Sequence, residues 1–210
     1  MQAEIEKFEK LDLDVAKRAV KIWRKNFGLN IGVYGEKNTK EDVDLANRLI
    51  REELDEYLEA VSNDDKVGQV DALADLFFVI VQKECVDSWF ADTRMEEYKH
   101  EPNISTVVEE LLRHPKHKSR YLDCYKTIAK KLGVCFLSAI TEVFNSNMSK
   151  ACTTKEEAQQ TVEKYKSEGV DTYVKKYNTY FVVKRKGDGK VLKSINFKEP
   201  DLKEFACYID

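Results

Sequence analysis

The sequence predicts a mainly α-helical protein: an antiparallel helical bundle with an inserted helical segment and a small C-terminal β-hairpin. Helix breakers are scarce, since the 210 residues include only 3 Pro and 8 Gly. Apolar residues recur every three or four positions over long stretches, which is typical of amphipathic helices. Hydrophobic residues make up 42% of the chain, which is enough for a sizeable core.

Three long helices are expected in the first half of the chain. The first covers residues 4–27, and Gly28 is placed to end it. The second begins after Thr39, which forms a capping box with Asp42, and runs to about residue 60. The third covers residues 66–87, and its second half is apolar on nearly every side. The short connection between the second and third helices predicts an antiparallel pair with the third at the centre of the bundle.

The second half is expected to add shorter helices and the hairpin. Four shorter helices are predicted, at residues 106–113, 119–132, 134–145 and 154–168. A β-hairpin is predicted around Asp188-Gly189, because alternating aromatic and β-branched residues flank that turn signal. The expected organisation is a core of residues 1–170, with an insertion at about 88–133. Residues 171–210 are expected to form a hairpin and tail packed on the same domain.

Composition argues against several classes of protein. The net charge of −3 gives no indication of a nucleic-acid-binding surface. No apolar run approaches ~20 residues, so no membrane span is expected, and the acidic N-terminus does not resemble a signal peptide. The five cysteines form no CxxC pair, which favours reduced thiols in a cytoplasmic protein. The basic run from His114 to Arg120 is expected to be a solvated loop rather than a zinc or nucleic-acid site.

Acidic residues lie on one face of each of two neighbouring helices. Glu52, Glu53 and Glu56 are three or four positions apart, as are Asp71 and Asp75. Like charges at this spacing repel unless a cation neutralises them. Asp75 is also surrounded in sequence by apolar residues, and a carboxylate near a core is costly unless it is paired or bound to a metal. The pattern predicts an oxygen-rich pocket for Mg²⁺, with Mn²⁺ as a substitute.

Two other interpretations of these acids remain open. An acidic segment on a charged helix is often simply a solvated face. A di-iron carboxylate site would also use helical acids, but it would require Glu-x-x-His motifs, and His100, His114 and His117 all lie elsewhere.

The acidic pattern resembles a known family. Glu52-Glu53-x-x-Glu56 followed by Asp71-Ala-Leu-Ala-Asp75 is similar to the EExxE and ExxD signature of the MazG-like all-alpha nucleoside triphosphate pyrophosphohydrolases. The first acid of the second motif is shifted, because Ala72 stands three positions before Asp75. The segments 145–150 (NSNMSK) and 188–193 (DGKVLK) resemble two further stretches of a MazG-like subset. The resemblance covers residues 1–87 and 134–203.

This resemblance implies Mg²⁺-dependent hydrolysis of a nucleoside triphosphate to the monophosphate and pyrophosphate. Glu53, Glu56, Asp71 and Asp75 would hold the metal, and Glu52 together with Glu53 would act on the attacking water. The resemblance also implies a homodimer or a dimer of dimers, which is a common arrangement in general.

A triphosphate also needs cations and donors beyond the metal, and the nucleobase needs an apolar slot. The candidate substrate-binding residues are Asn147, Lys150, Arg48, Lys190, Lys193, Trp23 and Phe27. Each has an alternative role. Lys150, Lys190 and Lys193 could be solvated, Arg48 could form an intrahelical ion pair with Glu52, and the two aromatic residues could be core.

Three functions follow from these expectations. The first is nucleotide-pool sanitation or balance by hydrolysis of a deoxynucleoside or non-standard nucleoside triphosphate. The alternatives are a non-catalytic module that binds a nucleotide or a protein, and a phosphoribosyl-ATP pyrophosphohydrolase.

Overall fold

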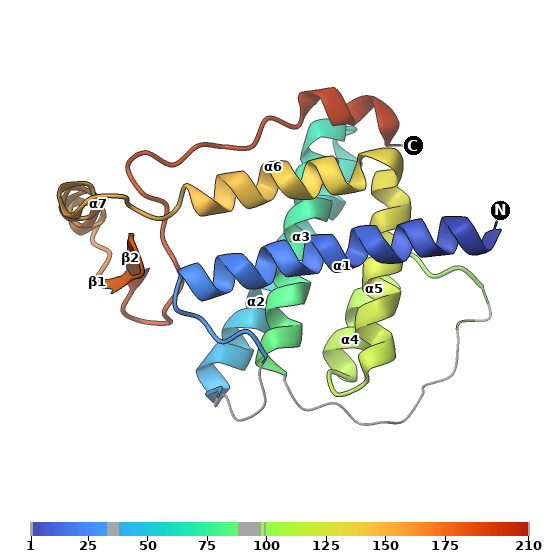
Figure 1. The fold of residues 1–210 in the computed structure, drawn as a ribbon, viewed down its shortest axis with the longest axis horizontal. Helices are drawn as coiled ribbons and strands as arrows, with labels where there is room; N and C mark the ends of the chain where they lie inside the picture. The colour runs from blue at the N-terminus through green and yellow to red at the C-terminus, as the bar shows by residue number, and fades with distance from the viewer. Residues whose placement is uncertain (1, 33–37, 88–97, 99, 210) are drawn as a thin grey trace.

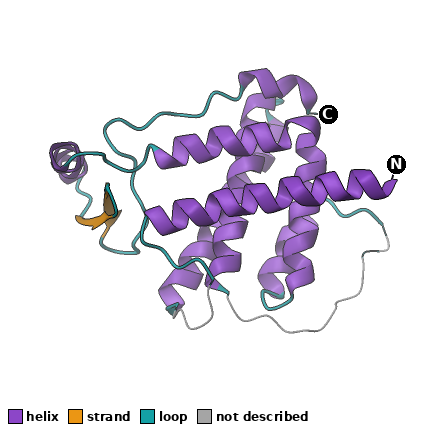
Figure 2. Cartoon of the chain, in the orientation of Figure 1, coloured by secondary structure: helices purple, strands orange, loops and turns teal. Residues whose placement is uncertain are grey.

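The computed structural model describes residues 2–32, 38–87, 98 and 100–209, with side chains from residue 12 onward (Figure 1). The described residues form mainly helices and one two-stranded antiparallel sheet, which confirms the predicted fold class (Figure 2). The α-helices are α1 (Gln2–Asn26), α2 (Lys40–Ser62), α3 (Lys66–Val86), α4 (Ile104–Arg113), α5 (Lys118–Leu132), α6 (Phe136–Met148) and α7 (Lys155–Ser167). The strands are β1 (Thr172–Tyr177) and β2 (Tyr180–Arg185), and short 3₁₀ helices cover Gly133–Cys135 and Lys203–Tyr208.

Helix α3 is the centre of the fold. It forms the antiparallel pair with α2, and α1, α5 and α6 also pack against it (Figure 1). From Leu76 to Val81 every side chain is buried, because this stretch is apolar all round the helix. The predicted central position of this helix is therefore confirmed.

Capping fixes where several helices begin. The predicted capping box at Thr39 is present, since its side chain accepts from the Asp42 N–H and Asp42 accepts from the Thr39 N–H. Thr154 caps α7 by accepting from the Glu157 N–H, but the Glu157 carboxylate turns to the Thr153 N–H instead. Thr154 and Glu157 therefore form only half of a capping box.

The segment between α3 and α6 belongs to the main core. Val107 and Leu111 on α4, and Tyr125 and Ile128 on α5, are buried in the same apolar cluster as α3. The two helices expected here are confirmed. The predicted solvated loop between them is only partly solvated, because Arg120 is 5% exposed and pairs with Asp123. The part of this segment at 88–97 and residue 99 lie outside the described residues.

The hairpin differs from its prediction. The strands turn at Asn178-Thr179, where Asn178 has a φ of 49° and Tyr177 pairs with Tyr180. Asn tolerates this left-handed conformation better than most residues. Asp188-Gly189 does form a turn, but beyond it Val191 makes only an isolated bridge to Lys184. The predicted hairpin turn at Asp188-Gly189 was therefore wrong, because the strands already turn at Asn178-Thr179. Asp-Gly is the more familiar hairpin sequence, and it was preferred for that reason.

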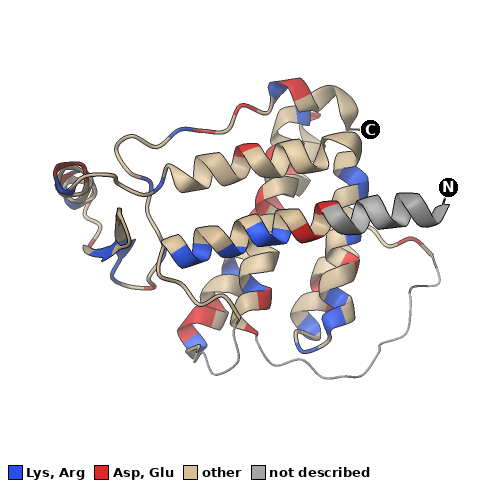
Figure 3. Cartoon of the chain, in the orientation of Figure 1, with Lys and Arg blue, Asp and Glu red and all other residues tan. Residues whose placement is uncertain are grey.

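None of the described helices is long and apolar enough to cross a membrane. Charged residues recur along α1, α2 and α5 (Figure 3). The five cysteines are all free thiols, and Cys207 alone among them is exposed.

Gly28 joins the end of α1 to the hairpin. Its φ is 61°, and the Leu29 N–H donates to the Arg24 carbonyl at 2.8 Å, which closes the helix as predicted. A Cβ at Gly28 would lie 1.9 Å from Cε1 of Tyr177 on β1. The bare backbone at Gly28 is therefore what lets the hairpin approach α1.

We predict that Gly28→Ala destabilises the protein by about 3 kcal/mol, because backbone strain adds to a clash with the Tyr177 ring. Gly169→Ala is the matched control: Gly169 has a φ of 75°, but nothing lies within 4 Å of its Cβ position. That variant should lose only about 1 kcal/mol. Urea unfolding measures both, and equal losses would contradict the close contact with Tyr177.

Candidate functional site

A pocket of about 410 Å³ lies between the α2–α3 pair, the end of α6, the hairpin and the C-terminal tail. The four predicted metal-binding acids line one end of it, and five of the residues predicted to bind substrate also line the pocket. The nine residues are Glu53, Glu56, Asp71, Asp75, Trp23, Asn147, Lys150, Lys190 and Lys193. This volume is within the usual range of small-molecule sites.

The pocket follows one stripe on each of two helices. On α3 the stripe runs from Asp71 and Asp75 through Phe78 to Gln82, at helical steps of three or four. On α2 it runs in the opposite direction, from Leu49 to the glutamates. Because the helices are antiparallel, acid meets acid at one end and apolar residues meet in the middle. Asp71 and Gln82 are 11 residues apart, so the stripe extends about 16 Å.

The carboxylates at the acidic end are desolvated and repel one another. Burial, followed by the charge of Asp75, raises the pKa of Glu53 and of Glu56. Burial and the charge of Asp75 also raise the pKa of Asp71 to about 7. The Asp71 Oδ1 atom is buried and has no hydrogen-bond partner among the described residues. This end of the pocket is therefore poised to accept protons or a cation.

Asn147 connects the acidic end to Lys150. Its amide nitrogen donates to Asp75 Oδ1 at 3.3 Å, while its amide oxygen accepts from Lys150 Nζ. Its backbone carbonyl accepts from Trp23 Nε1 at 2.9 Å, which fixes the end of α6 against α1. Burial lowers the pKa of Lys150, and the charges of Asp75 and Glu53 oppose that shift. The predicted grouping of Asn147 and Lys150 with the acids is thus observed.

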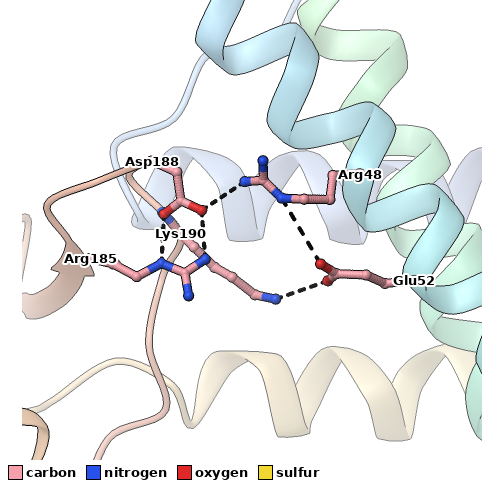
Figure 4. A network of polar contacts seen from close by, with 5 residues as sticks. All are labelled: Arg48, Glu52, Arg185, Asp188 and Lys190. Carbon is pink, nitrogen blue, oxygen red and sulfur yellow. Dashed lines mark hydrogen bonds and ion pairs between the residues drawn. The ribbon is translucent and has the colours of Figure 1, made fainter. Parts of the chain in front are cut away.

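Glu52 lies outside the pocket lining and takes part in a network of ion pairs with the loop after β2 (Figure 4). Glu52 Oε2 accepts from Lys190 Nζ at 3.0 Å, and its other oxygen is 4.0 Å from Arg48 Nε. Arg48 also donates to Asp188 Oδ2 at 2.7 Å, and Asp188 in turn accepts from Arg185. The pKa of Asp188 is lowered to about 2 by its hydrogen bond with Arg185. The network holds the Asp188-Gly189 turn against α2.

The remaining predicted residues have mixed positions. Trp23 lines the pocket, but Phe27 is fully buried and stacks on Trp23 with ring centroids 4.5 Å apart. Phe27 is therefore a core residue, which was the alternative to a substrate-binding role expected from the sequence. Lys193 lines the pocket and pairs with Glu199 at 2.8 Å. Arg48 makes the expected contact with Glu52, and it does not line the pocket.

Several pocket residues were not predicted from the sequence, namely Arg24, Gln82, Lys184 and Glu199. Gln82 continues the α3 stripe one helical step beyond Phe78, so the spacing alone could have revealed it. Lys184 shares the inward strand face with Val182, and it was hidden because the hairpin was predicted in the wrong register.

The acidic end fits a hard divalent cation by its chemistry. Its donors are all carboxylates, their raised pKa values reflect unrelieved repulsion, and Asp71 Oδ1 is an orphaned buried acceptor. Within the described part of the chain, however, no three Asp, Glu, His or Cys side chains are arranged to hold a metal ion together. The residues share a pocket without converging on one point, so metal binding by these four acids stays a prediction.

We predict that the metal-free protein becomes less stable as the pH rises from about 4 to about 7. An acid whose pKa is raised by folding binds more protons in the folded state over this window, so the free energy of unfolding falls as those protons leave. Mg²⁺ should restore the melting temperature at pH 8 and have little effect at pH 4. Melting curves with and without Mg²⁺ at each pH measure this.

Asp75→Asn tests the same cluster by removing one charge. It should raise the melting temperature of the metal-free protein at pH 8 and reduce its response to Mg²⁺. Asp55→Asn, at an exposed position of α2, is the matched control and should change neither. A Mg²⁺ response that survives in Asp75→Asn would contradict a cation site at this end of the pocket.

Comparison with known proteins places a family match on the acidic helices. Residues 30–85 match the family model of phosphoribosyl-ATP pyrophosphohydrolase, a member of the MazG-like all-alpha nucleoside triphosphate pyrophosphohydrolase superfamily. No curated protein and no solved structure gives a significant match. The matched segment is roughly a quarter of the chain and contains α2, nearly all of α3 and the four acids of the pocket. The match indicates a pyrophosphohydrolase-type activity on nucleotides.

Proposed function

We propose that this protein is an Mg²⁺-dependent pyrophosphohydrolase that converts a nucleoside triphosphate to the monophosphate and pyrophosphate. The observation that carries the proposal is the position of four carboxylates and three lysines, Lys150, Lys190 and Lys193, around one end of a single pocket. That mixture suits a metal-bound polyphosphate chain, because the acids hold the cation and the lysines neutralise the remaining phosphate charge. Deoxynucleoside or non-standard nucleoside triphosphates, removed to sanitise or balance the nucleotide pool, are the proposed substrates.

In this proposal Glu53, Glu56, Asp71 and Asp75 hold Mg²⁺, or Mn²⁺ in its place. The bound ion would neutralise phosphate charge and favour ionisation of the attacking water. Lys150 and Asn147 would contact phosphate oxygens, since both already lie beside Asp75. Trp23 would form part of the wall beside them.

Glu53 is the better placed of the two predicted catalytic glutamates. It lines the pocket and can accept the proton of the attacking water, whereas Glu52 is engaged with Lys190 at the edge of the site. We therefore assign Glu53 to the water and Glu52 to positioning Lys190. Arg48 supports this arrangement by binding Asp188.

Phosphoribosyl-ATP is the second candidate substrate, because the family model that matches α2 and α3 bears its name. It shares the triphosphate chain and would use the same acidic end. The third possibility, a non-catalytic nucleotide- or protein-binding module, is motivated by the lack of three converging metal ligands in the described residues.

We predict that the protein releases pyrophosphate from at least one nucleotide in a panel of ribo- and deoxynucleoside triphosphates, non-standard triphosphates and phosphoribosyl-ATP. Phosphorus NMR with Mg²⁺ distinguishes pyrophosphate from orthophosphate. Glu56→Gln and Asp75→Asn should each lower kcat/KM about a hundredfold or more, because each removes a proposed metal ligand. The exposed Asp55→Asn should retain full activity.

The result separates the candidates. Faster hydrolysis of phosphoribosyl-ATP than of any triphosphate would favour the second one. Nucleotide binding without turnover across the panel would favour the non-catalytic module. Activity that survives both substitutions would exclude the acidic end as the reaction site.

We also propose a homodimer or a dimer of dimers. Leu58 and Val61 lie on one face at the end of α2 and are 44% and 45% exposed, and Ile22 on α1 is 49% exposed. Side chains of this size are often covered in an assembly. Light scattering should give at least twice the monomer mass of 24.4 kDa. Replacing Leu58 and Val61 by lysine should lower that mass, and a monomeric wild-type protein would contradict this proposal.

A further inference from the structure

The end of the pocket opposite the acids is formed by a different group of side chains. Arg24, Gln82 and Lys184 line it, together with Asp42 and Tyr173. Gln82 is seven residues beyond Asp75 on α3, which corresponds to about 10 Å along the helix. Apolar side chains from α2 and α3 separate the two ends, namely Leu45, Ala46, Leu49, Phe78 and Val79. A nucleotide with its phosphates among the acids would extend its base along these apolar residues toward the far end.

Lys184 is an unusual residue at this far end. Its side chain is 4% exposed, on the same inward strand face as the core residue Val182. Lys184 Nζ lies 5.2 Å from the centre of the Tyr177 ring, and it has no hydrogen-bond or ion-pair partner among the described residues. Burial, then the charges of Lys175 and Arg24, lowers its pKa to about 8. The side chain of Lys184 is largely buried and its ammonium faces the pocket, so an acceptor on a ligand would be favoured here.

The neighbours of Lys184 also offer donors. Arg24 is 5% exposed and is held by hydrogen bonds to the Asn30 carbonyl and to Gln82 Oε1, the latter at 3.3 Å. Because the Gln82 oxygen is occupied by Arg24, its amide nitrogen is the group left to face a ligand. Asp42, a carboxylate at this end, uses Oδ2 in the cap of α2.

We propose that this far end is a base-reading site that selects nucleobases presenting a carbonyl oxygen, rather than an amino group, at their outer edge. Lys184 and Gln82 donate to the carbonyl oxygen, and Arg24 orients Gln82. An amino group at the same position of the base would point its N–H donors at these donors, which disfavours it. Uracil and hypoxanthine are accepted on this basis, and cytosine and adenine are rejected.

The inference rests on the proposed function and deepens it by naming the class of base. Two matched pairs of substrates test it, UTP against CTP and ITP against ATP, since the members of each pair differ in a carbonyl or an amino group at one ring position and in the hydrogen on the adjacent ring nitrogen. The deoxy forms replace them if the enzyme hydrolyses those faster. The wild-type protein should show a kcat/KM at least about tenfold higher for the carbonyl member of both pairs.

Lys184→Met should bring both ratios to within about threefold of one, and the loss should appear as a higher KM for UTP and ITP rather than as a lower kcat. Gln82→Glu should reduce the ratios further or invert them, because it places an acceptor where the base carbonyl would lie. Lys186→Met removes the same charge from an exposed position just beyond β2 and should keep the wild-type ratios. Melting temperatures close to that of the wild-type protein show that each variant is folded.

Three results would overturn the inference. The first is equal rates within each pair for the wild-type protein. The second is a loss of kcat/KM in Lys184→Met that is the same for all four nucleotides. The third is a change of the ratios in Lys186→Met as large as that in Lys184→Met. If no triphosphate is hydrolysed, the proposed function fails, and calorimetric binding of UMP against CMP then tests the base site by itself. Tighter binding of UMP that disappears in Lys184→Met would support the site, and equal binding would refute it.

Discussion

The repulsion among carboxylates at the interface of α2 and α3 is the constraint on which the rest of this structure depends. Packing two antiparallel helices tightly would ordinarily select apolar residues along the whole contact. Here Glu53, Asp71 and Asp75 interrupt that contact at one end, and their desolvation raises their pKa values. The protein compensates with basic side chains brought from later segments, above all Lys150 from the end of α6. Attraction between Lys150 and the carboxylates of Asp75 and Glu53 therefore offsets part of the repulsion at this end of the pocket.

The hairpin and tail carry the opposite wall of the site. The ion pairs among Arg48, Asp188 and Arg185, together with Lys190 and Glu52, attach the loop after β2 to α2 without using any residue of the core. These pairs are partly exposed, so each contributes little stability by itself. Their main effect is to fix the position of Lys190 relative to the glutamates of α2.

Much of the helical fold was accessible from the sequence because capping and periodicity are local. Thr39 and Asp42 define the start of α2, and the apolar run after Asp75 identifies α3 as central. The same periodicity grouped the four acids of α2 and α3, which follows from 3.6-residue geometry and one short connection between two helices. Asn147 and Lys150 were associated with the acids by the family resemblance and by the need of a triphosphate for donors and cations.

What the sequence did not reveal depends on contacts between distant segments. The hairpin register depends on a left-handed Asn178, a weaker signal than the Asp-Gly that follows it, and the error in register concealed Lys184. Trp23 and Phe27 belong to the same helix face. Trp23 reaches the pocket, whereas Phe27 does not, because it stacks on Trp23 and is enclosed by the core. The ion pairs of Glu52 and Arg48 with residues about 140 positions away could not be inferred from local spacing.

The attachment of the hairpin at Gly28 has a consequence for how this protein could change over time. Tyr177 rests on Gly28, and Lys184 lies beside the Tyr177 ring, so the part of the far wall that the hairpin supplies contacts α1. Substitutions of Lys184 and Tyr177 can therefore alter this wall without replacing the carboxylates or the ion pairs of Arg185. Such a division lets natural selection or a protein engineer vary one half of the site while the chemistry of the other half is inherited intact.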